Sequence, residues 1–226
     1  MKEHELHNYK LVLQYEGIRY NGWQKQKNQE NTIQEVVENA VFDGTGERAE
    51  VIGSGRTDAG THAMGQVANV KLGQDLEPER LMDNINKHLP SDIKILECEK
   101  VDNRFHARLN AKAKTYMYTL CVGKKPDVFN RRTVLHYCAD LDVDAMKKAA
   151  EYLKGEHDFM SFCSNKRTKK STVRKIYDIE IIKDGDEISF IFKGNGFLYN
   201  MVRILTGTLV EVGLGKTNPE DMPKIL

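Results

Sequence analysis

The sequence predicts an α+β fold: two similar α/β subdomains, a largely antiparallel mixed sheet running through both, and helices on one face. Segments that alternate apolar and polar residues, typical of half-buried strands, are interspersed with segments whose apolar residues recur at helical spacing. The first half reads strand, helix, strand, strand, helix, strand. The second half has strands before and after one helix, then a long apolar helix. This mixture predicts layered α+β units.

In the first half, residues 9–15 alternate as a strand that ends at the Gly17 turn. Thr32 and Glu35 have the Thr-x-x-Glu spacing of a capping box, so we expect a helix to begin there and to end at Gly44. Further strands are predicted at 50–53, 66–71 and 93–101, with a second helix that begins at Pro78 and buries Leu81, Ile85 and Leu89.

In the second half, the expected elements are a strand at 114–122, a helix capped by Asp142 and closed by Gly155, a hairpin at 173–192 that turns at Asp184-Gly185, an apolar helix at 198–212 and a new helix start at 218–220. No Pro/Ser-rich linker separates the halves, so we expect their sheets to run together. We assign residues 1–105 to an N-terminal subdomain and residues 106–226 to a C-terminal subdomain that is shortened at its end.

The chain has 226 residues, of which 40% are hydrophobic and 30% charged, an ordinary composition for a soluble protein. No apolar run is long enough to span a membrane, and the charged N-terminus does not resemble a signal peptide. The four cysteines are widely spaced and form no Cys-x-x-Cys pair, which favours free thiols in a reducing cytoplasm. We therefore expect a cytoplasmic protein with no membrane association.

The loop at residues 53–63 is the strongest candidate for chemistry. Its glycines allow the backbone to turn sharply or to lie close to another segment. If the backbone is extended at Thr57, Arg56 and Asp58 lie on the same side. A guanidinium beside a carboxylate favours the ionised form and orients it, so Asp58 is a candidate nucleophile. An Arg-x-Asp pair in such a turn is also typical of a structural ion pair, and residue types alone favour that second interpretation.

Basic residues cluster locally although the formal net charge is only +1. Such clusters can follow a phosphate backbone, but each is equally typical of a solvated loop. One cluster is Lys166, Arg167, Lys169, Lys170, Arg174 and Lys175, and the other is Arg104, Arg108, Lys112 and Lys114.

Other motifs fail. The segment 213–217 ends like a P-loop, but Val210 occupies the place of the required glycine. The histidines show no metal-binding spacing, and the sequence therefore predicts no metal, no nucleotide cofactor and no other cofactor. His157-Asp158 could form a catalytic pair in an unrelated hydrolase, but a histidine at a helix end beside an acid is usually structural.

The loop resembles the signature of the TruA-type tRNA pseudouridine synthases in the run Arg56-Thr57-Asp58-Ala59-Gly60 with the residues that follow it. The resemblance extends along nearly the whole chain, in order. It is carried by Gly22-Trp23-Gln24 with Thr32-Ile33-Gln34, by residues 105–108 with 114–118, by residues 155–162, and by residues 196–203. Four short matches at similar separations, beside the Arg-Thr-Asp loop, are specific.

This resemblance implies the pseudouridine synthase fold and an isomerase, an intramolecular transferase, that converts uridine to pseudouridine in the anticodon stem-loop of tRNA, at positions 38 to 40. It implies Asp58 as the catalytic nucleophile, with Arg56 fixing it. Tyr116 matches the ring that stacks on the target base, and Arg203 a second basic residue near the acid. Strand packing and helix-end charge remain the alternative explanations for these two residues. The partners implied are tRNA and, in a homodimer, a second copy of the chain.

Family members usually continue beyond the helix that begins at Pro219, into a segment that helps line the uridine pocket. Because that segment is missing here, a catalytically impaired tRNA-binding protein of the same fold remains an alternative. Residues Lys166, Arg167, Lys169, Lys170 and Arg108 are the candidate RNA contacts.

Overall fold

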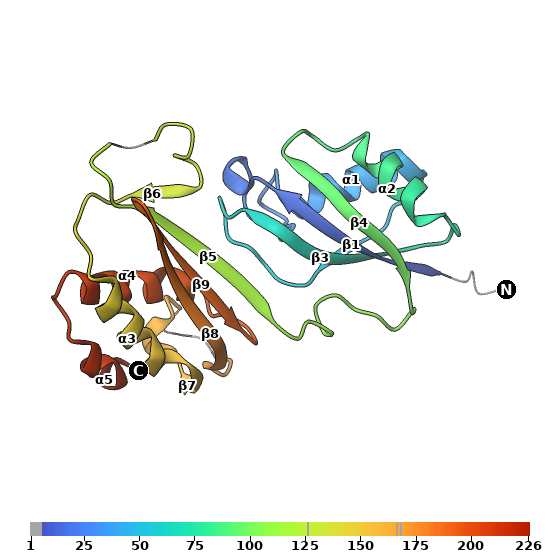
Figure 1. Ribbon diagram of the computed structural model, residues 1–226. Helices are drawn as coiled ribbons and strands as arrows, with labels where there is room; N and C mark the ends of the chain where they lie inside the picture. Colours follow the sequence, from blue (N-terminus) through green and yellow to red (C-terminus); the bar gives the residue numbers. More distant parts are fainter. Residues whose placement is uncertain (1–5, 126, 166, 168) are drawn as a thin grey trace. The chain divides into compact units, whose positions relative to one another are not determined.

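The computed structural model describes residues 6–125, 127–165, 167 and 169–226. The chain divides into two compact units, Met1–Ala111 and Lys112–Leu226 (Figure 1). This division lies beyond the boundary that we expected between residues 105 and 106. The buried Asn8 gives a physical reason, because its Nδ2 donates to the main-chain oxygens of Asp102 and Phe105 at 3.0 and 2.9 Å and holds that turn to the first unit.

The first unit is a four-stranded antiparallel sheet of order β2-β3-β1-β4, with α1 and α2 on one face (Figure 1). Its elements are β1 (His7–Tyr15), η1 (Gly17–Arg19), α1 (Ile33–Thr45), β2 (Val51–Gly53), β3 (Ala63–Leu72), α2 (Pro78–Asn86) and β4 (Ile93–Val101).

The core of this unit lies between the sheet and its two helices. Alternate β1 residues Tyr9, Leu11 and Leu13 are fully buried and belong to one cluster with Val37 of α1 and Ile85 of α2. Burying an aliphatic or aromatic side chain of this size contributes about 1.5–3 kcal/mol. The alternation that predicted the strand therefore also selects the face that the helices cover.

The start of α1 confirms the predicted cap, because the Thr32 hydroxyl oxygen accepts a hydrogen bond from the Glu35 amide at 3.4 Å. The predicted end at Gly44 is wrong. The helix continues through Thr45, and Gly46 closes it in the left-handed conformation, with its amide donating to the Phe42 oxygen at 2.7 Å.

The second unit is a five-stranded mixed sheet of order β6-β5-β9-β8-β7, in which β5 and β6 pair in parallel and the other pairs are antiparallel. Its buried cluster joins the sheet to α3 and α4 through residues such as Phe190, Ile181, Met146 and Leu205. Its elements are β5 (Lys114–Cys121), β6 (Val134–His136), α3 (Val143–Leu153), β7 (Gly155–Asp158), η2 (Met160–Phe162), β8 (Val173–Asp184), β9 (Glu187–Gly194), α4 (Met201–Gly213), η3 (Pro219–Asp221) and α5 (Met222–Ile225).

The α+β class is confirmed, but the expectation of one sheet through both halves is wrong. The strands of the described residues form two separately hydrogen-bonded sheets, one in each unit, and the stretch between β4 and β5 is turn and coil. The short strands β6 and β7 were not predicted. Within the described ranges, no helix is long and apolar enough to cross a membrane.

The cap of α1 yields a stability prediction. Thr32→Ala removes the hydroxyl that accepts from Glu35, and we expect the free energy of unfolding to fall by about 1 kcal/mol. Thr32→Ser keeps that oxygen and removes only a methyl group, so it should recover most of the loss. Chemical denaturation of the three proteins measures the difference. Equal losses in both variants would show that packing of the buried methyl group, and not the cap, matters at this position.

Candidate active site

The loop that carries Arg56 and Asp58 connects β2 to β3 and is held by hydrogen bonds along its length. The Trp23 amide donates to the Thr57 oxygen at 3.0 Å, and the Tyr15 hydroxyl lies 2.9 Å from the Thr57 hydroxyl. The Thr61 amide donates to the Asp58 oxygen at 3.1 Å, and the Gly60 amide donates to the Tyr20 oxygen at 3.3 Å. The backbone on both sides of Asp58 is therefore fixed by segment 15–23.

Two glycines of that segment make the close approach possible. A Cβ atom at Gly17 would lie 1.9 Å from the Thr61 oxygen, and one at Gly22 would lie 2.5 Å from the Thr57 oxygen. Gly22 also has a positive φ of 81°, which disfavours any other residue. Gly17 and Gly22 thus let two backbones touch where a side chain would separate them.

Both candidate catalytic side chains are exposed, so the acid is accessible to another molecule. Arg56 does not pair with Asp58 as we expected from the alternation of side chains. Its Nε donates instead to Gln24 Oε1 at 3.2 Å, and in the described part of the chain no ion pair joins the guanidinium to the Asp58 carboxylate. Gln24 directly follows Trp23 in the sequence. The Trp23–Thr57 hydrogen bond therefore brings the side-chain amide of Gln24 to the guanidinium, where it takes the place expected for Asp58.

A cavity of about 510 Å³ lies beside this loop and brings Arg56 together with His106 and Arg108. Arg108, one of the predicted RNA contacts, is exposed at its rim. Among the described residues that line the cavity, Asp58 is not included. The first unit therefore gathers two arginines and a histidine next to the acidic loop.

Two buried asparagines that we did not select from the sequence hold the turn that carries Arg108. Asn69 Oδ1 accepts from the Ala107 amide at 2.9 Å, and Asn69 Nδ2 donates to Asn8 Oδ1 at 3.1 Å. Asn8 and Asn69 are 0% and 1% exposed. A polar residue inside an apolar strand pattern was the available signal, because such a group must find partners when it is buried.

A charged cluster braces the other side of the loop. Asp92 accepts from the Tyr20 hydroxyl at 2.8 Å and from Arg19 Nε and Nη2 at 2.9 and 2.6 Å. Burial and the hydrogen bond to Asp92 raise the pKa of Tyr20 to about 12. Burial acts to raise the pKa of the Asp92 carboxyl as well, but the hydrogen bonds from Tyr20 and Arg19 hold that pKa below its ordinary value. Asp92 thereby fixes Tyr20, whose main-chain oxygen holds Gly60.

Tyr116 and Arg203 lie in the second unit. Tyr116 is a half-buried residue of β5, and its ring packs edge-on against Phe197 with centroids 5.1 Å apart. Phe197 belongs to the bend that leads to α4, and Arg203 is exposed in the first turn of that helix. A cation at a helix N-terminus opposes the macrodipole, so helix stability does not explain Arg203.

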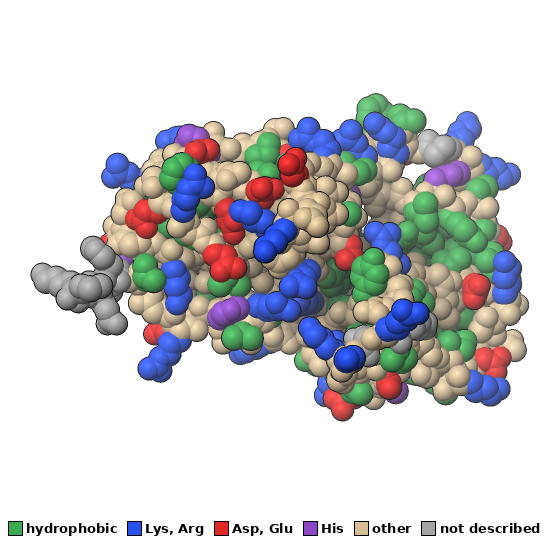
Figure 2. Space-filling model, turned by 180° about the vertical axis from the view of Figure 1, so that it is seen from behind, with side chains coloured by type: hydrophobic (Ala, Val, Ile, Leu, Met, Phe, Trp, Pro, Cys, Tyr) green, Lys and Arg blue, Asp and Glu red, His purple; other side chains and the backbone are tan. Residues whose placement is uncertain are grey.

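Arg167, Lys169 and Lys170 are exposed in the segment between η2 and β8. Lys166, which we also predicted as an RNA contact, lies outside the described residues. On the face shown in Figure 2, Lys and Arg side chains are interspersed with Asp and Glu side chains. The positive charge is local, in keeping with the formal net charge of +1.

The side chains of His157 and Asp158 make hydrogen bonds to nearby residues of the same unit. His157 Nε2 lies 2.8 Å from the Lys154 oxygen, and Asp158 accepts from the Met160 amide and the Thr172 hydroxyl. These contacts match the structural interpretation of the pair and do not support a hydrolase. Among the described residues, no group of three His, Cys, Asp or Glu side chains is arranged to hold a metal ion.

Comparison with known proteins identifies the class. The sequence model of the tRNA pseudouridine synthase family matches residues 11–110 and 149–226. The chain belongs to this family, a class of isomerases that act on tRNA. The matched ranges include Arg56, Asp58 and Arg203, whereas Tyr116 lies between them.

The chain is also similar along nearly its whole length to individual members of this family. The chain is 44% identical over 221 residues to tRNA pseudouridine synthase A 2 of Bacillus cereus, covering 98% of this chain and 90% of the relative. It is 46% identical over 221 residues to tRNA pseudouridine synthase A of a Bacillus species, covering 98% and 91%. It is 47% identical over 219 residues to tRNA pseudouridine synthase A of Brevibacillus brevis, covering 96% and 88%.

The close approach at Gly17 predicts a loss of both stability and activity. Gly17→Ala must displace the Thr61 backbone, and we expect it to destabilise the protein by about 1–3 kcal/mol, the usual cost of overpacking. We also expect slower pseudouridine formation because Asp58 shifts with the loop. Gly65→Ala is the matched control, since its added methyl meets only Val12 at 3.7 Å. Thermal unfolding and turnover measure both effects, and a Gly17→Ala protein like the control would contradict the packing described here.

The lowered pKa of Asp92 predicts how its contribution depends on pH. A carboxylate whose pKa is lower in the folded state stabilises the fold above its unfolded pKa, and this stabilisation is lost as pH falls through the folded pKa. We expect Asp92→Asn to lower the free energy of unfolding by about 1–3 kcal/mol at neutral pH. The difference from the unmodified protein should shrink in acid. Urea titrations at several pH values test this, and a pH-independent difference would refute the role of the charge.

Proposed function

We propose that this protein isomerises uridine to pseudouridine in the anticodon stem-loop of tRNA, with the Asp58 carboxylate as the nucleophile. The observation that carries the proposal is that Asp58 is exposed on a loop whose backbone is hydrogen-bonded on both sides of it, at Thr57 to Trp23 and at Gly60 to Tyr20. An acid presented in this way can meet a substrate without first being uncovered or reoriented as a whole loop.

The reaction breaks the N1–C1′ bond of uridine and forms a C5–C1′ bond. The proton on C5 is released and N1 gains a proton, so the product is an isomer. Positive charge develops at the anomeric carbon when the glycosidic bond breaks, and a carboxylate suits that task as nucleophile or as electrostatic stabiliser. Attack at C1′, attack at C6 and removal of the C2′ proton are the three ways in which Asp58 could act.

The uridine must leave its stack before Asp58 can reach it, which costs a few kcal/mol. Stacking of the base on an aromatic ring such as Tyr116 returns about 1–3 kcal/mol. Because these two terms nearly cancel, most of the affinity must come from phosphate contacts. The exposed cations Arg108, Arg203, Arg167, Lys169 and Lys170 are suited to this role. Lys166, which the sequence suggests for the same role, lies outside the described residues.

We further propose that the protein acts in the cytoplasm as a homodimer in which one tRNA touches both subunits. The second candidate function is tRNA binding without catalysis. The absence of an Arg56–Asp58 ion pair in the described part of the chain favours it, since Asp58 then lacks the neighbour expected to orient it.

Release of tritium from C5-labelled uridine in tRNA tests the proposal. We expect the unmodified protein to release the label and Asp58→Ala to slow release by about 10³-fold or more, as removal of a nucleophile does in other enzymes. Asp43→Ala, at an exposed aspartate of α1, is the control that should not change the rate. Retention of the label by the unmodified protein would favour the binding function. Equal release by the Asp58→Ala protein would remove Asp58 from the mechanism.

A further inference from the structure

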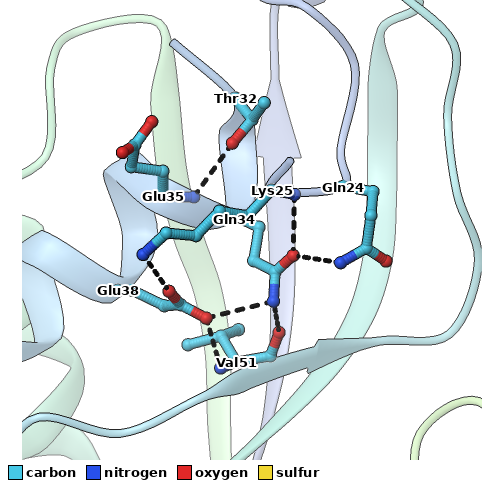
Figure 3. Close-up of polar contacts among 7 residues, drawn as sticks. All are labelled: Gln24, Lys25, Thr32, Gln34, Glu35, Glu38 and Val51. Atoms are coloured by element: carbon cyan, nitrogen blue, oxygen red, sulfur yellow. Dashed lines mark hydrogen bonds and ion pairs between the residues drawn. The ribbon is translucent and has the colours of Figure 1, made fainter. Parts of the chain in front are cut away.

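A chain of side-chain amides connects Arg56 to the interior of the first unit. Arg56 Nε donates to Gln24 Oε1 at 3.2 Å, and Gln24 Nε2 donates to Gln34 Oε1 at 2.7 Å. Gln34 Nε2 donates to Glu38 Oε1 at 3.0 Å and to the Val51 oxygen at 3.2 Å. Figure 3 shows the inner part of this chain, from Gln24 to Glu38 and Val51. It runs from a surface cation to a carboxylate on α1.

Main-chain groups fix the direction of every bond in this chain. Gln34 Oε1 faces the Lys25 amide at 2.9 Å, which can only donate, and Gln34 Nε2 faces the Val51 oxygen, which can only accept. The Gln34 amide therefore has one possible orientation. Because Gln34 presents its oxygen to Gln24, Gln24 must present its nitrogen there and its oxygen to Arg56. The acceptor at Arg56 is thus determined by the backbone at Lys25 and Val51.

Burial makes the inner end of the chain rigid. Gln34 is 4% exposed and Val51 is 0% exposed, so their polar groups must be paired with protein. Glu38 accepts from Gln34, from the Val51 amide at 3.2 Å and from Lys25 Nζ at 3.2 Å. Gln24 is half-buried, and Arg56 is exposed. The side chains therefore become more exposed from α1 outward. Gln24 is the residue that connects the buried Gln34 to the exposed guanidinium.

The contact uses only one nitrogen of Arg56. Within the described residues, the terminal nitrogens Nη1 and Nη2 make no hydrogen bond or ion pair, so they remain available to a substrate. Immobilising a long, rotamer-rich side chain costs about 1.5–2 kcal/mol of conformational entropy. If Gln24 restricts Arg56 before tRNA arrives, part of that cost is met during folding and not during catalysis.

We infer that Gln24 is a positioning residue, oriented by Gln34, that holds the Arg56 guanidinium at the Asp58 loop for the transition state. This inference rests on the proposed function. The contacts of Gln34 and Glu38 with Val51 also satisfy the outward-facing main-chain groups of the edge strand β2, which is a structural role. Gln24 does not take part in those contacts, so its role can be tested separately from the stability of the strand.

A double-mutant cycle tests the coupling. Gln24→Met is similar in size and offers Arg56 only a weak thioether acceptor in place of the amide oxygen. Gln34 Oε1 keeps its bond from the Lys25 amide, so the fold should persist. We expect Gln24→Met to lower kcat for tritium release about 10-fold, with a change in KM of less than about 3-fold. In the Arg56→Ala background the same substitution should cost less than about 2-fold, because the residue it positions is gone. Gln29→Met, in the exposed loop nearby, is the matched control.

A loss of the same factor in both backgrounds would overturn the inference, because a structural effect of Gln24 would not depend on Arg56.

The heteronuclear NOE of the Arg56 Nε–H group provides a second measurement. It is made on the unmodified protein, so it depends neither on enzymatic activity nor on the folding of a variant. We expect a value close to that of the backbone in the unmodified protein. A value typical of a mobile surface arginine would overturn the inference. Failure of the unmodified protein to release tritium would refute the proposed function and leave this second measurement unaffected.

Discussion

The candidate site depends on the contact between two backbone segments of the first unit. The stretch from Tyr15 to Trp23 lies against the loop from Thr57 to Thr61, and the Trp23–Thr57 hydrogen bond of 3.0 Å joins them at one end. Main-chain polar groups in such a contact must be paired, which fixes the relative position of the segments. The same contact places Gln24 next to Arg56. It also connects Asp92 to the loop, because Asp92 accepts from the Tyr20 hydroxyl and the Tyr20 main-chain oxygen accepts from the Gly60 amide.

The local elements were largely predictable because each depends on neighbouring residues. The Thr32 cap and the alternation of β1 gave the right element types. The end of α1 was misplaced because Gly44 and Gly46 are both plausible stops, and only the conformation of the chain distinguishes them. The strands β6 and β7 have three and four residues, too few to show an alternating pattern, and both are stabilised by pairing with partners distant in the sequence.

The site was predictable as a list of residues but not as a set of contacts. The loop and its acid could be recognised, since glycines, an arginine and an aspartate follow one another directly. The partner of Arg56 could not, because Gln24 is 32 positions away and the expected neighbour Asp58 is only two. The approach of Arg108 to Arg56 depends in the same way on Asn69, a buried residue of a different strand.

The one-way order of donors and acceptors from Lys25 and Val51 to Arg56 also restricts which sequences can keep this site. Glutamate has nearly the shape of glutamine and is one base change away in the genetic code. At position 34 it would turn an oxygen towards the Glu38 carboxylate, and at position 24 it would turn one towards the Gln34 oxygen. Glutamine to glutamate, which changes the shape of the side chain very little, is therefore unfavourable at both positions because it brings two oxygen acceptors together.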